Sequence, residues 1–281
     1  MLEYDHILKI CDEIKPVCAE NNVEFESSIL TIGLLMTVER AEIMAERCNL
    51  KSIQISMDGS ENNYCSIRGV PPITYNTVIK NITDIAQLCD KVKIAVRLNA
   101  SKKNIDDLKV LCDILLSQNN LKEKILVYLA EIKDYTKCFE KDCSVFKIGE
   151  YEIIKNEFYK YLQEKYGVYN ENIIVKKRFS PSYCRLVCAS NALIGPNGEL
   201  YKCDQSIGNP DHVIGNVVDG YYFNKAFDDF CNVNHFEKCK VCKIFPICLS
   251  GCKSACNNLG ENAIDCDGLL LSLKTVLKKY Y

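Results

Sequence analysis

The first half of the chain alternates short apolar runs with longer amphipathic stretches. Four runs rich in Ile, Val and Leu begin about 30 to 40 residues apart, as strands do when a helix separates each from the next. They cover residues 23–30, 52–58, 92–100 and 124–132. The pattern therefore predicts four buried strands.

Helical periodicity fills the intervals between these runs. Apolar residues recur at i, i+3, i+4 and i+7 in residues 74–90 and 104–118, which is the pattern of an amphipathic helix. Residues 37–48 begin with Thr37, a residue type that suits a helix start. One more amphipathic helix, residues 4–20, precedes the first strand.

Continuous apolar strands that alternate with helices predict an α/β protein with a parallel sheet and right-handed crossovers. Four strands are too few to close a barrel, so an open sheet and the second half of a barrel both fit the pattern. The opening helix has no strand before it in this sequence, which favours the partial barrel.

Polar side chains gather where the predicted strands end. They are Ser56, Asp58, Gly59, Arg97, Asn99 and Glu131. Chemistry in parallel α/β folds sits at the carboxyl ends of strands, so these residues are candidates for a site. The alternative is that the Asp58-Gly59 pair only turns the chain and that the charged residues make ordinary surface ion pairs.

The pattern divides the chain into three parts. These are a strand–helix part at residues 1–140, a linker helix and strand at residues 141–183, and a cysteine-rich part at residues 184–281. In the linker we expect an aromatic-rich helix that Gly167 ends, and an edge strand at residues 172–179 that is protected by Lys and Arg. In the third part, residues 191–203 place apolar segments around Pro-Asn-Gly, which predicts a hairpin with Cys203 at its end.

Composition limits the classes of partner and compartment. The net charge is −2, so nothing in it calls for nucleic acid or an anionic membrane. The amino-terminal residues show no basic and apolar signal regions, and no apolar run reaches the roughly 20 residues of a membrane span. The 18 cysteines are therefore expected in a reducing cytoplasm, where dense cysteines serve as metal or cluster ligands rather than disulfides.

Ten of the cysteines fall within residues 184–266, and their spacing separates the possible chemistries. Zinc prefers four ligands, commonly as two CxxC pairs, but this region has one such pair, Cys239 and Cys242. Iron–sulfur clusters take four thiolates each and accept wider spacing. Eight candidate ligands form two sets of four, and Cys231 and Cys256 are left over as buried thiols.

This spacing resembles the SPASM domain of radical S-adenosylmethionine (radical SAM) enzymes. The matching intervals are C-x9-G-x4-C, at residues 188–203, and C-x2-C-x5-C-x3-C, at residues 239–252, followed by a last cysteine. The resemblance implies two auxiliary [4Fe–4S] clusters with interleaved ligands. One would use Cys184, Cys188, Cys203 and Cys252, and the other Cys239, Cys242, Cys248 and Cys266.

The first half is similar to the catalytic barrel of the same family, from its third strand onward. The likeness lies in "LTIGLLMT" at residues 30–37, "QISMDGSENNYCSIRG" at residues 54–69 and "AVRLNA" at residues 95–100. It implies that residues of these segments contact S-adenosylmethionine. They are Ser56, Asp58, Arg68, Arg97 and Asn99.

The sequence departs from the family in one respect. It contains neither the CxxxCxxC loop that holds the SAM-cleaving cluster nor the Gly-Gly-Glu-Pro segment. We therefore expect the carboxyl-terminal two-thirds of such a protein, inactive alone. A third cluster and S-adenosylmethionine chemistry would then require an amino-terminal part, for example one supplied in trans.

The resemblance implies a maturase that modifies a side chain of a peptide or protein substrate by radical chemistry. In the related sulfatase maturases, an Asp at the place of Asp204 is the catalytic base, although an Asp there can also cap a turn. Two other functions stay open. One is a non-catalytic cluster-bearing module that binds peptide or passes electrons, and the other is a zinc-binding structural domain.

Overall fold

The computed structural model describes residues 3–118, 121–132, 145–146, 150–168, 184–231, 236–260 and 266–280. The chain forms two compact units. The first comprises Met1–Lys133 and Glu140–Ile173, and the second comprises Asp134–Phe139 and Ile174–Tyr281. Each unit is described on its own below. Among the described helices, none is both long and apolar enough to cross a membrane.

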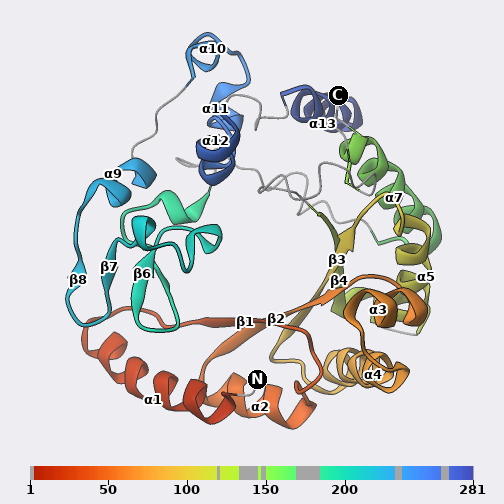
Figure 1. Ribbon diagram of the computed structural model, residues 1–281. Helices are drawn as coiled ribbons and strands as arrows, with labels where there is room; N and C mark the ends of the chain where they lie inside the picture. Colours follow the sequence, from red (N-terminus) through yellow and green to blue (C-terminus); the bar gives the residue numbers. More distant parts are fainter. Residues whose placement is uncertain are drawn as a thin grey trace. The chain divides into compact units, whose positions relative to one another are not determined.

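A parallel four-stranded sheet forms the centre of the first unit (Figure 1). Its strands are β1 (Ser27–Thr31), β2 (Leu50–Met57), β3 (Lys93–Ala100) and β4 (Ile125–Glu131), and they lie side by side in chain order. This confirms the predicted α/β class and all four predicted strands. The order 1-2-3-4 arises because each crossover moves one strand further in the same direction.

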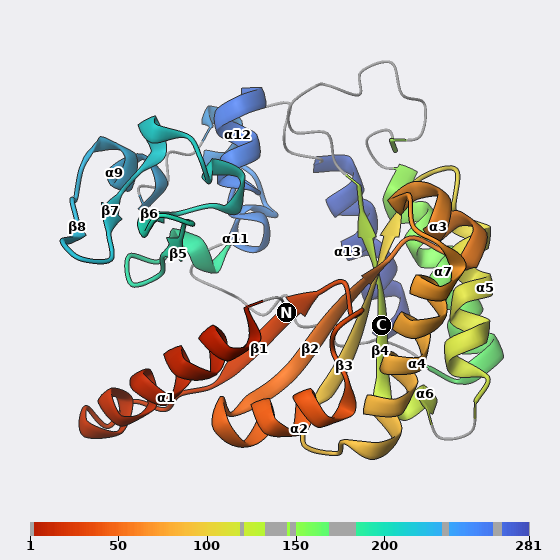
Figure 2. The ribbon, with the colours of Figure 1, turned by 60° about the horizontal axis from the view of Figure 1, so that its bottom comes forward.

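Helices cover one face of this sheet (Figure 2). They are α1 (Tyr4–Glu20), α2 (Val38–Arg47), α3 (Glu61–Arg68), α4 (Pro72–Leu88), α5 (Ile105–Leu116), α6 (Leu121–Lys124) and α7 (Glu150–Tyr166). The predicted start at Thr37 is confirmed, because its hydroxyl accepts the Arg40 N–H at 3.3 Å. The predicted end at Gly167 is also confirmed: its φ is +67°, and its N–H donates to the Gln163 carbonyl at 3.0 Å.

The strands alternate strictly between the two faces of the sheet. The helix-covered face carries fully buried apolar side chains, namely Ile53, Ile55, Met57, Ile94, Val96, Leu98, Ile125, Val127 and Leu129. The residues between them on β2 and β3 are only half-buried from Gln54 and Ala95 onward. Helices on one face and the strand order β1-β2-β3-β4 agree with the predicted partial barrel.

The second unit contains a small antiparallel sheet with the order β5-β6-β7-β8. Its elements are η1 (Arg185–Val187), β5 (Leu193–Ile194), β6 (Glu199–Tyr201), η2 (Asp204–Ser206), η3 (Pro210–His212), β7 (Gly215–Asn216), β8 (Gly220–Tyr221), α9 (Lys225–Cys231), α10 (Glu237–Lys240), α11 (Phe245–Cys248), α12 (Lys253–Leu259) and α13 (Cys266–Tyr280). The predicted hairpin is confirmed as β5 and β6, with Leu193 paired to Tyr201. The predicted strand at residues 172–179 lies outside the described residues.

A small apolar core holds the described part of this second unit together. Leu200, Ile214 and Phe227 are buried against one another, with Tyr221 packed beside them. Chains with so small a core commonly gain stability from bound metal or disulfides. No disulfide joins the cysteines of the described residues.

Candidate functional site

Asp58 holds together the carboxyl-terminal edge of the parallel sheet. It follows β2, is 6% exposed, and accepts hydrogen bonds on every oxygen. Arg68 Nε donates to Oδ2 at 2.6 Å and Asn99 Nδ2 to Oδ1 at 2.8 Å. The Asn63 and Asn104 amides donate to its backbone carbonyl at 2.6 and 2.9 Å. Asp58 therefore ties the loop after β2 to the end of β3.

The next residue, Gly59, has to be glycine. Its φ is +141°, and a Cβ at this position would lie 1.8 Å from Asp107 Oδ2. That carboxylate accepts the backbone N–H of Ser60 at 2.7 Å as well as its hydroxyl. Only a residue without a Cβ allows this close approach. The Asp-Gly pair thus turns the chain and also builds the edge, while its role in a functional site stays a prediction.

The Arg68 guanidinium makes its contacts with other residues of the protein. It ends α3 and reaches back to β2, where its Nη2 donates to the Ser56 carbonyl at 2.9 Å. Its guanidinium also stacks over the Tyr64 ring at 4.7 Å. Of the predicted S-adenosylmethionine contacts, Asp58, Arg68 and Asn99 are thus joined in one network. Arg68 fixes the loop, and its Nε and Nη2 groups have protein partners.

Arg97 is placed differently, on the half-buried face of β3. The sheet register sets it between Ser56 on β2 and Tyr128 on β4. Its Nε is buried and has no hydrogen-bond partner, and no carboxylate among the described residues pairs with it. Burial raises the pKa of Tyr128, while the Arg97 charge opposes that rise. An unpaired guanidinium here is suited to bind a carboxylate.

Two further residues belong to this face, although they were not in the predicted set. The Tyr128 hydroxyl donates to Gln54 Oε1 at 2.5 Å across β3. The sequence held part of the signal, because Gln54 stands two residues before Ser56 and so shares its face of β2. The pairing of Tyr128 with Arg97 depends on the register of β3 and β4. The face thus presents an amide, a hydroxyl, a phenol and a guanidinium in neighbouring positions.

In the second unit, the end of the β5–β6 hairpin meets the start of α12. Cys203 follows β6, is 8% exposed, and its Sγ lies 3.4 Å from Asp204 Oδ1. Burial raises the pKa of the Cys203 thiol, while a hydrogen bond with Ser254 acts against the rise. Since Ser254 is two residues beyond Cys252, the structure brings two predicted ligands of the same cluster into one neighbourhood.

Three other cysteines lie near Cys256. Burial raises the pKa of the Cys256 thiol to about 11, and the neighbouring thiols of Cys252, Cys239 and Cys248 contribute to the rise. Cys256 lies one helical turn after Cys252 and also meets the Ser250 carbonyl at 3.2 Å. It is therefore a neighbour of the predicted ligands, although the sequence left it over as a bystander.

The residues fit an iron–sulfur cluster in their chemistry. The eight predicted ligands are cysteines that form no disulfide, and all of them lie in the unit with the small core. In the described part of the chain, no three or more His, Cys, Asp or Glu side chains are grouped to hold a single metal ion. The unit also contains a fully buried cation, Lys202, which has no carboxylate partner among the described residues. A cluster held by four thiolates is an anion that would complement it.

Asp204 has the geometry of a turn residue. It begins the η2 turn, is exposed, and its Oδ1 accepts the Gln205 N–H at 2.9 Å. This contact is of the kind that Asp makes in short turns. The predicted catalytic role of Asp204 stays a prediction.

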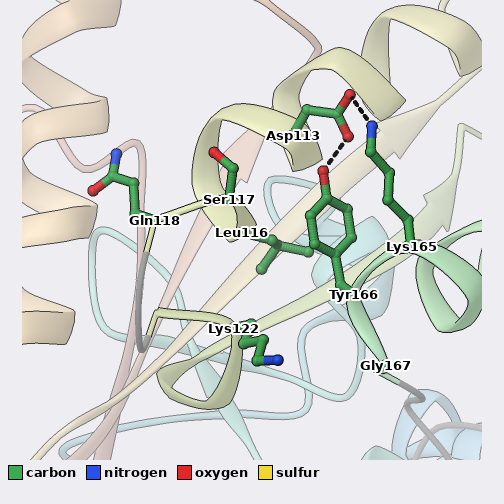
Figure 3. Close-up of a pocket in the computed structure, with 8 residues that line it drawn as sticks. All are labelled: Asp113, Leu116, Ser117, Gln118, Lys122, Lys165, Tyr166 and Gly167. Atoms are coloured by element: carbon green, nitrogen blue, oxygen red, sulfur yellow. Dashed lines mark hydrogen bonds and ion pairs between the residues drawn. The ribbon is translucent and has the colours of Figure 1, made fainter.

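An open pocket of about 980 Å³ lies elsewhere on the first unit (Figure 3). It is lined by Asp113, Leu116, Ser117, Gln118, Lys122, Lys165, Tyr166 and Gly167. Burial would raise the pKa of Asp113, but hydrogen bonds from Lys165, Tyr161 and Tyr166 lower it. The pocket lies beside the carboxyl end of α5 and just before β4, hence at the opposite edge of the sheet from Asp58. Asp113 and Lys165 pair with each other there, and we assign the pocket no role.

The structure resembles solved structures over nearly its whole length. "Native anSMEcpe with bound AdoMet" matches with a TM-score of 0.64 and 15% identity, over 96% of this chain and 80% of that chain. The form with AdoMet and the Cp18Cys peptide gives 0.65 and 15%, over 97% and 82%. The form with the Kp18Cys peptide gives 0.63 and 16%, over 92% and 77%. No family model and no curated protein matches the sequence.

At this level of identity the likeness establishes the fold. The chain has an α/β fold of the radical SAM type, in which a parallel sheet is followed by a second, antiparallel one.

The Asp58 network can be tested through stability. Asp58→Asn leaves Arg68, whose side chain is 20% exposed, without its anionic partner, and we expect a loss of about 3 kcal/mol in the free energy of unfolding. Asp106→Asn is the matched control, because that carboxylate is 93% exposed and pairs only with Lys109; its loss should stay below about 1 kcal/mol. Chemical denaturation measures both, and equal losses would contradict the anchoring role.

Proposed function

We propose that the chain is an iron–sulfur protein of the radical SAM/SPASM class that acts on a peptide or protein. The observation that carries the proposal is the coincidence of a SPASM cysteine spacing with a radical SAM-type fold along 96% of the chain. The matching structure anSMEcpe is a radical SAM/SPASM anaerobic sulfatase-maturating enzyme. It was solved with AdoMet and with peptides bound, which supports both a cofactor and a substrate class.

The cofactor assignment follows the two sets of thiols. Cys184, Cys188, Cys203 and Cys252 would hold one [4Fe–4S] cluster, and Cys239, Cys242, Cys248 and Cys266 the other. Bound clusters would supply electron transfer, with potentials set by the charge and hydrogen bonds around them. The protein's own contribution is to bury Cys203, Cys239 and Cys248, which excludes water from the cluster sulfurs.

The AdoMet assignment rests on the polar face of the parallel sheet. We propose that Arg97 binds the carboxylate of the methionine moiety and that Ser56 and Asn99 contact the same ligand from neighbouring strands. Asp58 and Arg68 would act indirectly, because their contacts hold the loop that borders this face. Burial of the unpartnered Arg97 Nε favours a ligand over a solvated surface role.

The first test is metal analysis after anaerobic reconstitution. Two clusters, each held by four cysteines, require about eight Fe and eight sulfide per chain, and we expect Cys203→Ala to lose about half of both. Because metal binding and folding are coupled in small cysteine-rich domains, the second unit should also melt at a lower temperature. Cys112→Ala is the control, since Cys112 is a buried thiol of the first unit and should leave the iron content unchanged.

Two outcomes of that analysis would refute the cluster assignment. One is zinc without sulfide in the unmodified chain, which would favour a structural zinc domain. The other is an unchanged iron content in Cys203→Ala.

The second test is AdoMet binding by calorimetry. Arg97→Met removes a charged hydrogen bond worth about 1.5–3 kcal/mol, so we expect binding to weaken by about ten- to a hundred-fold. Lys93→Met changes a cation on the same strand and the same face, but at the amino end and exposed, and should bind as the unmodified chain does. Equal affinities of all three proteins would show that Arg97 does not contact AdoMet.

A second candidate function is a cluster-bearing module that binds peptide or passes electrons without cleaving AdoMet. The observation in its favour is that residues 1–281 contain no CxxxCxxC triplet. We expect no 5′-deoxyadenosine from the cluster-loaded chain with AdoMet and dithionite, and its detection by chromatography would exclude the module and favour a complete enzyme.

A further inference from the structure

Lys202 connects two segments that carry predicted ligands. It stands between the end of β6 and Cys203 in the sequence, and it is 0% exposed. Its Nζ donates to the backbone carbonyls of Cys188, Ala189 and Asn191 at 2.7, 3.0 and 2.6 Å. The Lys202 side chain thus links the turn after Cys188 to the backbone next to Cys203.

The geometry shows that this nitrogen carries a charge. Three carbonyl acceptors need three N–H donors, and a lysine side chain has three only as an ammonium. The ammonium also lies over the rings of Phe227 at 4.9 Å and Tyr221 at 5.6 Å. Carbonyl dipoles and ring faces thus solvate it, and no carboxylate of the described chain is paired with it.

Desolvation makes a buried charge without a counter-ion unfavourable, so an ammonium retained here indicates an anion that binds nearby. Cys188 and Cys203 are both predicted ligands of the first cluster. A [4Fe–4S] cluster with four thiolates has a net negative charge in its usual oxidation states, and would provide the missing anion.

We propose that Lys202 is a positioning residue for the cluster of Cys184, Cys188, Cys203 and Cys252, and that its charge raises the reduction potential of that cluster. This inference rests on the proposed function. Its hydrogen bonds fix the Cys188 turn relative to Cys203 before the cluster is inserted. Its positive charge stabilises the reduced cluster, which carries one more electron, in a region of low dielectric.

Two substitutions separate the hydrogen bonds from the charge. Lys202→Gln keeps two N–H donors but removes the charge, so it should hold both clusters while one potential shifts to a more negative value. Lys202→Met removes both, so we expect it to lose up to half of the iron as well. Lys225→Met is the control: this lysine belongs to the same unit, is 87% exposed and pairs with Asp229.

The measurements are iron and sulfide content, circular dichroism, and redox titration followed by electron paramagnetic resonance. A negative shift of one of two potentials in Lys202→Gln, absent in Lys225→Met, supports the inference. Unchanged potentials in Lys202→Gln overturn it, whether or not Lys202→Met folds. If the unmodified chain binds no iron–sulfur cluster at all, that result refutes the proposed function and with it the inference about Lys202. Wild-type iron content with unshifted potentials refutes the role of Lys202 alone.

Discussion

The one-sided burial of the parallel sheet is the constraint on which the first unit depends. Residues 53, 55 and 57 of β2 and residues 94, 96 and 98 of β3 are buried completely under the helices, so their neighbours must all face the other way. A change of register by one residue would exchange the two faces. The apolar core therefore fixes the positions of Gln54, Ser56, Arg97 and Tyr128, although these side chains contribute little to the core themselves.

The carboxyl edge of the sheet depends on the Asp58-Gly59 pair. Asp58 accepts hydrogen bonds from α3, from β3 and from the loop before α5, so it joins three segments that are distant in the sequence. Gly59 permits the close approach of Asp107 that completes this edge. Because these contacts are internal, they engage Arg68, whereas Arg97 has no carboxylate partner among the described residues and a buried Nε without a hydrogen bond.

The sequence was sufficient for the strands, the main helices and the β5–β6 hairpin, because each depends on local periodicity or on a Pro-Asn-Gly turn. It did not reveal α3, whose polar residues 61–63 resemble a loop. Nor did it show that Arg68 would turn inward to Asp58, since that contact depends on the helix α3. Gln54 and Tyr128 were missed because the predicted site residues were those near strand ends, and because the register that pairs Tyr128 with Arg97 is set by the fold. The Lys202 contacts required coordinates, because nothing in "ELYKCD" indicates which carbonyls its ammonium reaches.

Arg97 and Lys202 present the same physical problem in two different units. Each is a cation in a partly or fully buried position, and in the described parts of the chain neither pairs with a carboxylate. Apoprotein stability alone would favour an apolar residue at either place, because desolvation of an unpaired charge opposes folding. The two cations differ in their solvation, however. Lys202 has three carbonyls and two rings, which suits a permanent electrostatic role beside a resident cofactor. Arg97 keeps an unsatisfied Nε, which suits a ligand that binds and leaves.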